Sequence, residues 1–168
     1  MPLYTYNPTS NTTPDQGGTA AVTTPSNTGH ASSTCSSLDL NDSDALSCRW
    51  QGFPAPGGQV TSVTLKFDHT SSGALSGVGA NNAFTAEYSL NNGGSWNGAV
   101  SRTHFTASQG PTTFSVSLST SQDLTQVRVR DRLDSSTVSN GESASCTATM
   151  ANIKIEVQTP DAGAVVMM

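Results

Sequence analysis

Apolar and polar residues alternate with a period of two along much of the chain from residue 45 onward. Val63, Leu65 and Phe67 share one side of a segment whose other side carries Thr64 and Lys66. The same alternation recurs at Phe84, Ala86, Tyr88 and Leu90, at Phe114, Val116 and Leu118, and at Val127 and Val129. A period of two places every second side chain on one face of a strand. Such faces need a second sheet to cover them, so the sequence predicts an all-β fold, an antiparallel β-sandwich of the jelly-roll-like kind.

The pattern also predicts where strands begin and end. We expect strands over residues 45–53, 60–69, 83–90, 96–107 (irregular), 112–119, 125–133 and 143–157. A Pro/Gly turn at 54–58 and an Asn-Asn-Gly-Gly hairpin turn at 91–94 separate two pairs of them. In the last strand the apolar phase changes from Met150 to Ile153, so we expect a bulge near residues 151–152.

Three regions are expected along the chain. Residues 1–33 are rich in Thr, Asn, Ser, Pro and Gly, and cannot bury enough surface to fold alone. This region is either a flexible tail or an extended arm that becomes ordered against a neighbour, and a short strand at 20–24 is a further reading. Residues 34–158 form the sandwich domain. Residues 159–168 form a short C-terminal tail whose apolar end would dock on the domain or on a partner.

Charge is scarce on this chain. Only 11% of its 168 residues are charged, and hydroxyl and amide groups take their place. A net charge of −5 argues against a nucleic-acid partner, which needs clustered Lys and Arg. Residues 1–6 lack the features of a secretory signal, and no apolar run could cross a bilayer. We therefore expect synthesis in the cytoplasm without a signal peptide, and no membrane partner.

The cysteines do not indicate a disulfide framework or a zinc site. Cys35, Cys48 and Cys146 are too few and too widely spaced for either. Cys48 and Cys146 alternate with apolar neighbours and fit small core positions. A Cys35–Cys48 bridge is the less favoured alternative.

The sequence predicts neither an enzyme nor a resident cofactor. Oxygen ligands alternate as they do at the start of a calcium loop, at Asp39, Asn41, Asp42 and Asp44. The glycine and the terminal glutamate of an EF-hand are missing, so ordinary turn formation is favoured over calcium binding. The histidines show no metal spacing, and no nucleophile motif is present.

Two features could contact a partner. Arg128, Arg130 and Arg132 line one face of a strand, where acidic neighbours such as Glu87 or Asp68, or an acidic partner, could pair with them. Residues 89–96 resemble an Asp-box, in which an Asx side chain organises a hairpin turn and a Trp packs beside it. We interpret this motif as turn architecture rather than as a glycan contact.

A resemblance of layout gives the functional hypothesis. The Arg-Trp-Gln-Gly-Phe strand, its Pro/Gly turn, the Val-Thr-Ser-Val-Thr-Leu-Lys-Phe strand, the hairpin at 88–96 and the closing strand to 157 resemble β-sandwich domains of bacteriophage and bacterial surface proteins. The resemblance implies a non-enzymatic virion protein, either a capsid decoration (cement) protein or a tail or fibre component. Such a protein would lie on the virion surface or outside the cell, and would assemble with itself and with other particle proteins. Expected contact residues are Tyr4, Tyr6, Arg128, Arg130, Arg132, Val165, Val166 and Met167.

Two alternatives stay open beside the virion hypothesis. A carbohydrate-binding β-sandwich module would need solvent-facing aromatic side chains, of which Trp96 is the one to test. Trp50 and Tyr88 fall on the apolar phase of their strands, so we expect them in the core. The second alternative is a subunit of a self-polymerising surface filament.

Overall fold

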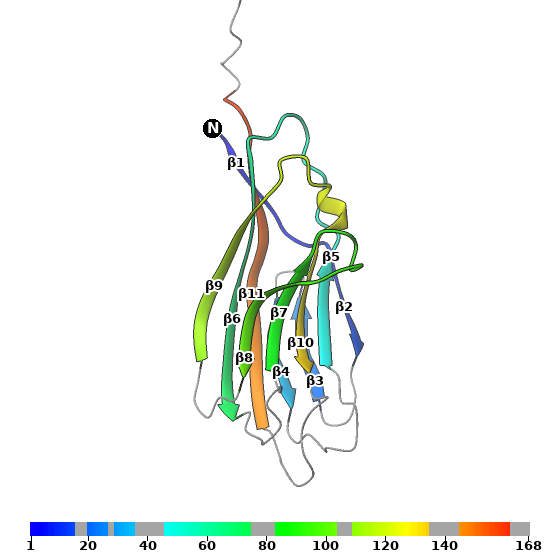
Figure 1. The fold of residues 1–168 in the computed structure, drawn as a ribbon, viewed down its shortest axis with the longest axis vertical. Coiled ribbons are helices and arrows are strands. Elements are labelled where there is room, and N and C mark those ends of the chain that lie inside the picture. Colours follow the sequence, from blue (N-terminus) through cyan, green and yellow to red (C-terminus); the bar gives the residue numbers. More distant parts are fainter. Residues whose placement is uncertain are drawn as a thin grey trace, which may run out of the picture.

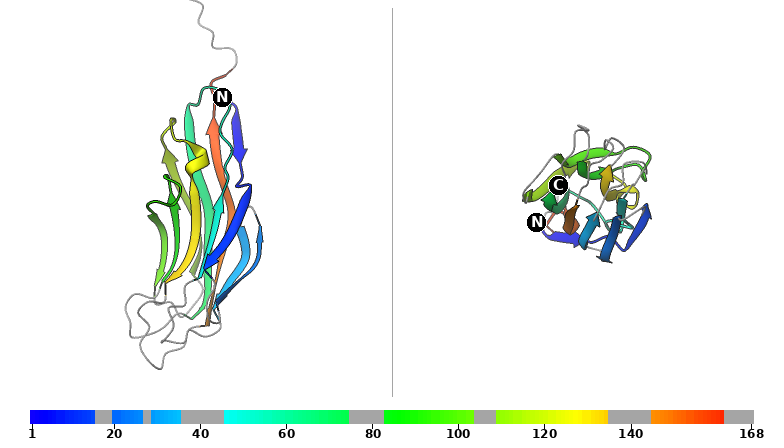
Figure 2. Two further views of the ribbon diagram at one scale, coloured as in Figure 1. Left: turned by 90° about the vertical axis from the view of Figure 1, so that its right-hand side faces the viewer. Right: turned by 90° about the horizontal axis from the view of Figure 1, so that it is seen from below.

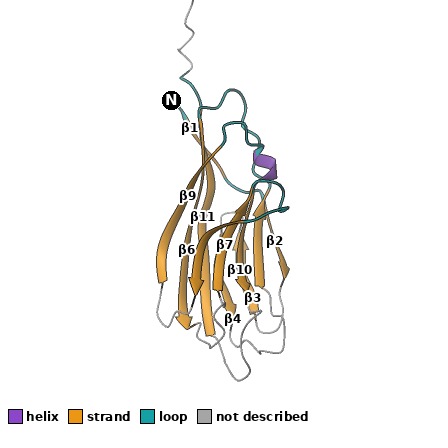
Figure 3. Ribbon diagram, viewed as in Figure 1, coloured by secondary structure: helices purple, strands orange, loops and turns teal. Residues whose placement is uncertain are grey.

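The computed structural model of the protein confirms an antiparallel β-sandwich. It describes residues 1–15, 20–26, 29–35, 46–74, 83–103, 109–134 and 145–161. Within these residues two sheets lie face to face, and their strands run along the long axis of the molecule (Figure 1). A short 3-10 turn, η1 (Leu124–Gln126), lies near the end of the sandwich where the N-terminus is found (Figure 3).

Each sheet has a defined strand order. Sheet A has the order β3-β4-β11-β6-β9, with β1 also paired to β11, and sheet B has the order β2-β5-β10-β7-β8. The strands of sheet A are β1 (Leu3–Tyr6), β3 (Ala20–Ser26), β4 (Gly29–Cys35), β6 (Ser62–Ala74), β9 (Gln109–Leu118) and β11 (Ser145–Gln158). Those of sheet B are β2 (Ser10–Asp15), β5 (Leu46–Gln51), β7 (Ala83–Ser89), β8 (Asn97–Thr103) and β10 (Arg128–Asp134). Seen along the long axis, the two layers enclose the interior between them (Figure 2).

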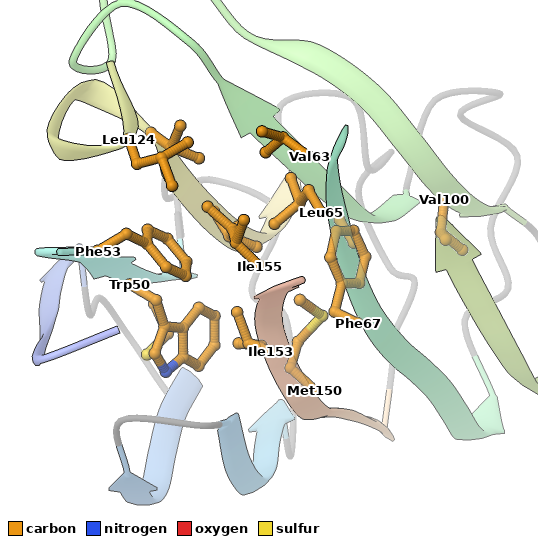
Figure 4. Close-up of a cluster of buried hydrophobic side chains, with 14 of the residues drawn as sticks. Trp50, Phe53, Val63, Leu65, Phe67, Val100, Leu124, Met150, Ile153 and Ile155 are labelled. Carbon is orange, nitrogen blue, oxygen red and sulfur yellow. The ribbon is translucent and has the colours of Figure 1, made fainter. Parts of the chain in front are cut away.

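The inward faces of both sheets form the hydrophobic core that the alternation predicts. Trp50 and Phe67 are fully buried, and Val63, Leu65 and Ile155 lie near them (Figure 4). The Trp50 indole N–H donates to the carbonyl oxygen of Ser26 at 2.8 Å, which joins β5 of sheet B to β3 of sheet A. This bond satisfies the polar atom of the largest core side chain and holds the two layers together.

The bulge predicted in the last strand is confirmed. Ala151 pairs with Asp68, whereas Lys154 pairs with Lys66, so β11 advances three residues while β6 moves back two. The extra residue lets Met150 and Ile153, which differ in phase, both face the core with no exposed surface. Asn152 sits inside this bulge with a φ of 54°.

The expectation for residues 1–33 differs most from the structure. Strands β1 and β2 pair with β11 and β5, and β3 pairs with β4, which continues onto β11. The described part of this region therefore adds strands to both sheets and does not form a separate arm. A strand at 20–24 is one of the readings that the sequence left open, and β3 includes these residues. The reason is that backbone hydrogen bonds and β-branched Thr can hold a strand that has few large apolar side chains.

Other expectations have mixed outcomes. The strands predicted from residue 45 onward are present, with ends shifted by a few residues, and η1 replaces the start of the strand expected at 125–133. The Cys35–Cys48 bridge is wrong, because Cys48 is a free, buried thiol. Residues 39, 41, 42, 44 and 165–167 lie outside the described residues. In the described part of the chain, no helix is long and apolar enough to span a membrane.

Candidate functional site

The outer face of sheet B gathers positive charge. In β10, Val129 and Asp131 are buried between the sheets, so Arg128, Arg130 and Arg132 point to the other side. Arg49 of β5 is the Cα partner of Arg130. Four of the chain's seven basic residues therefore share one face of a protein whose net charge is −5.

A tightly bonded hairpin turn positions an aromatic ring on this face. The Asn91 side-chain oxygen accepts from the backbone N–H of Ser95 at 2.8 Å and from the hydroxyl of Ser89 at 2.9 Å. The Ser89 hydroxyl in turn accepts from the N–H of Gly93 at 2.9 Å. These bonds fix the turn between β7 and β8 and with it Trp96, the last residue before β8. The prediction that residues 89–96 are turn architecture is confirmed.

Trp96 lies against two arginines. The Arg130 guanidinium carbon is 4.0 Å from the centroid of the indole ring, and that of Arg49 is 5.4 Å away. Both distances fall within the range of a cation–π contact. Trp96 remains partly exposed. We call the set Arg49, Glu87, Trp96, Arg128, Arg130 and Arg132 the arginine–tryptophan face.

Glu87 is the acidic member of this face. It is the Cα partner of Arg130 on the neighbouring strand β7, and its carboxylate oxygen lies 2.5 Å from the Arg130 Nε. The expected pairing with Glu87 is confirmed for Arg130, and the pairing expected with Asp68 is wrong, because Asp68 lies on β6 of sheet A and accepts from Thr113 and Asn152. Among the side chains that the structure describes on this face, Glu87 is the one carboxylate, so the other arginines depend on different partners.

Arg128 is held by neutral oxygen atoms. Its guanidinium donates to the carbonyl oxygens of Thr125 at 2.7 Å and Val127 at 2.9 Å, and to the side-chain oxygen of Asn92. Figure 1 shows the β7–β8 hairpin, which carries Asn92, beside η1. Burial lowers the pKa of Arg128, and the positive charge of Arg49 lowers it further. Arg128 and Arg49 are thus close enough to repel one another.

Among the residues that the structure describes, Arg49 has no carboxylate partner and its Nε has no hydrogen-bond acceptor. Its Nε is shielded from solvent without an acceptor, and its contact with Trp96 is the interaction that holds the guanidinium. A shielded donor without an acceptor is costly, and a guanidinium is always charged. The arginine–tryptophan face is therefore an incompletely neutralised surface with planar donors around a partly exposed ring.

A pocket on the outer face of sheet A is a second candidate. It has a volume of about 320 Å³ and is lined by Lys66, Phe67, Asp68, Thr113, Asn152 and Lys154. Asp68 accepts from Thr113 at 2.7 Å and from Asn152 at 2.6 Å. Glu156 binds Lys66 at 2.6 Å and Lys154 at 2.9 Å. The two lysines of this pocket are neutralised by Glu156 next to it, so we regard the pocket as part of the sheet's internal bonding.

A polar cluster inside the sandwich resembles a catalytic arrangement by residue type alone. His69 of β6 faces Asp131 of β10, with 3.6 Å between Nε2 and a carboxylate oxygen, and Ser71 is buried on the same side of β6. His69 and Asp131 are at most 2% exposed. Burial, and then the charge of Asp131, raises the pKa of Cys48 to about 12. These groups are sealed between the sheets, where a substrate cannot reach them.

The remaining predicted contact residues fall in different places. Tyr6 packs against the core, and Tyr4 lies half exposed on β1, away from the arginine–tryptophan face. Trp50 is buried and Tyr88 packs on the core, as predicted for both, and Phe53 is buried beside them. The described residues contain no group of three or more potential metal ligands.

Sequence reasoning missed Arg49 as a member of the site. It alternates with the core residues Cys48 and Trp50, so its outward direction could have been read from the pattern. Its position beside Arg130 depends on the pairing of β5 with β10, which the period of two does not specify.

Comparison with known proteins adds one structural neighbour. No protein-family model matches the chain, and no curated protein matches it. Among solved structures, the chain is similar to the N-terminal cellulose-binding domain of β-1,4-glucanase C from Cellulomonas fimi. The identity is 12%, the match covers 95% of this chain and 90% of that domain, and the TM-score is 0.41. The implied virion role finds no support in these comparisons, and the function is therefore inferred from the residues of this chain.

Proposed function

We propose that this protein is a non-catalytic carbohydrate-binding domain whose ligand lies on the outer face of sheet B. The observation that carries the proposal is the partly exposed Trp96 ring, which is fixed by a bonded hairpin turn and contacted by Arg49 and by Arg130, the partner of Glu87. A pyranose ring presents an apolar C–H face and a rim of hydroxyls. The first suits an indole ring and the second suits planar guanidinium and carboxylate groups.

The site is also organised in advance of binding. The cation–π contacts restrict the ring, and the Arg130–Glu87 ion pair holds the nearest guanidinium in place. Little side-chain freedom is then lost when a ligand arrives, which favours affinity. A sheet face built in this way suits one stretch of an extended polysaccharide rather than a small molecule enclosed in a cavity.

Binding to a panel of soluble and insoluble polysaccharides, followed by titration of the best ligand, tests the proposal. We expect Trp96→Ala to weaken binding by roughly tenfold, because the stacking contact is lost. Tyr4→Ala is the matched control, since it removes an exposed aromatic ring elsewhere. Trp96→Phe, which keeps a smaller ring, should retain part of the affinity.

Folding of each variant is checked by circular dichroism and thermal unfolding. Binding that falls in Trp96→Ala and holds in Tyr4→Ala, with both variants folded, supports the site. No binding to any polysaccharide, or equal affinity for the wild type and Trp96→Ala, would contradict it.

A further inference from the structure

The positive charge of the arginine–tryptophan face exceeds what its own residues neutralise. Arg130 has a carboxylate partner in Glu87, but Arg128 contacts neutral oxygens, and the Arg49 Nε finds no acceptor in the described part of the chain. On the opposite side of the sandwich, both lysines of the sheet A pocket share Glu156. Within the described residues the two outer faces thus differ, because Glu156 neutralises the lysines of one face, whereas Arg49 and Arg128 on the other have no carboxylate partner.

Arg49 and Arg128 occupy diagonal positions on neighbouring strands. Arg49 pairs with Arg130, and Arg128 lies two residues along β10 on the same face. Diagonal neighbours on one face of a sheet are about 7–8 Å apart at the backbone, within reach of two long side chains that converge on one group. The charge of Arg49 already lowers the pKa of Arg128, so the two guanidinium groups are electrostatically coupled.

We infer that the carbohydrate bound on this face is acidic, with a carboxylate or sulfate group lying between Arg49 and Arg128 while an adjoining sugar ring stacks on Trp96. This inference rests on the proposed function and names the class of its ligand. An anion at that point would relieve the repulsion between the two arginines. It would also give the Arg49 guanidinium an anionic acceptor, whereas its Nε has no acceptor among the described residues.

The geometry favours an acidic sugar chain over other polyanions. Phosphate contacts alone would need only the arginines, whereas this face places a partly exposed aromatic ring against two of them. Outside this face the protein has an excess of acidic residues, because its net charge is −5 although four arginines lie here. A long nucleic acid would meet that negative surface beyond the site.

The test compares matched ligands by calorimetry or affinity electrophoresis. The probes are polygalacturonate, its fully methyl-esterified neutral form, a sulfated glucan and a single-stranded oligonucleotide. We expect polygalacturonate or the sulfated glucan to bind more tightly than the neutral form, and added salt to weaken that binding. Preference between the carboxylated and the sulfated probe identifies which anion the site takes.

The variants separate charge from stacking. Arg49→Gln should weaken binding of the acidic probe by roughly tenfold and binding of the neutral probe by much less, because the glutamine amide can still donate to sugar hydroxyls but carries no charge. Arg49→Lys should retain part of the acidic affinity, since it keeps the charge but loses the planar donors. Lys66→Gln removes one positive charge from the other sheet and should not change the affinity for either probe. Trp96→Ala should weaken the binding of both probes.

Each contrary outcome has a distinct meaning. Equal affinity for acidic and neutral probes, both lost in Trp96→Ala, would overturn the acidic ligand and leave carbohydrate binding intact. Equal loss in Lys66→Gln and Arg49→Gln would overturn it as well, because only net charge would then matter. The inference of an acidic carbohydrate is also overturned if the oligonucleotide binds as tightly as the acidic sugars. Absence of binding to every sugar overturns both the inference and the proposed function.

Discussion

Asn152 controls the phase of the longest strand, and its replacement should destabilise the protein through two separable contributions. The residue has a φ of 54° within the bulge of β11, and its side-chain amide donates to Asp68 at 2.6 Å. A left-handed φ costs an alanine about 1 kcal/mol more than an asparagine or a glycine. A hydrogen bond to a carboxylate at an exposed position contributes roughly 1 kcal/mol, less than it would in the interior.

Asn152→Ala loses both contributions, so we expect the free energy of unfolding to fall by about 2 kcal/mol and the Tm by about 4–8 °C. Asn152→Gly loses the hydrogen bond but keeps the left-handed backbone, so its loss should be about half as large. Urea unfolding at pH 7, followed by fluorescence and circular dichroism, measures both values. Thr113→Val is the control, because it removes the other hydrogen bond to Asp68 and leaves the bulge unchanged.

The reasoning is tested by which of the two Asn152 variants loses more free energy of unfolding. If Asn152→Gly destabilises the protein as much as Asn152→Ala does, the backbone conformation contributes nothing and the reasoning fails. If both variants lose as much free energy of unfolding as Thr113→Val does, loss of the hydrogen bond to Asp68 explains the whole destabilisation. A change in the urea m-value would show that strand phase itself has shifted, because the area exposed on unfolding would differ.

Two further predictions follow from shifted pKa values. Hydrogen bonds from Asn152 and Thr113 hold the pKa of Asp68 below its ordinary 3.8, and Lys154 and Lys66 hold that of Glu156 below 4.5. The stabilisation that these two carboxylates provide is complete at a pH above their ordinary pKa values. It is lost as the pH falls through their lower pKa values in the folded protein. The urea midpoint should therefore fall with pH from about pH 4.5 downward, and less steeply in an Asp68→Asn, Glu156→Gln double variant. Cys48, with a pKa of about 12, should carry roughly one thiolate in 10⁴ molecules at pH 8, so peptide mapping should find it unalkylated until urea unfolds the protein.

The strands with strong alternation were predictable because burial on one face imposes a period of two. The bulge was predictable for the same reason, since Met150 and Ile153 cannot both face the core without an extra residue. Strands β1, β2 and β4 were not predictable, and β3 was only one of several open readings. They belong to a region rich in Thr, Ser and Asn, in which β1 and β4 pair with the distant β11 and β2 pairs with β5. Hydroxyl-rich segments of this kind carry almost no periodic signal.

The site was predictable only in part. The outward direction of Arg130 follows from its neighbours Val127 and Val129, and the hairpin turn follows from its Asn and Gly residues. The meeting of Trp96 with Arg49 requires three strands to pair in the correct order, because β10 must lie between β5 and β7. Sequence periodicity contains no information about that order, which is why the arginines could be foreseen and their contact with the ring could not.

Strand β11 has consequences for how the protein reaches its folded state. Its first half pairs with β4, its second half pairs with β1, and nearly its whole length pairs with β6. The contact between Tyr4 and Val157 joins positions near opposite ends of the sequence. Sheet A therefore cannot close until β11 has left the ribosome, and its earlier strands must remain with unpaired edges until then. Such distant pairing makes folding slow and leaves the unfinished chain open to association with its neighbours.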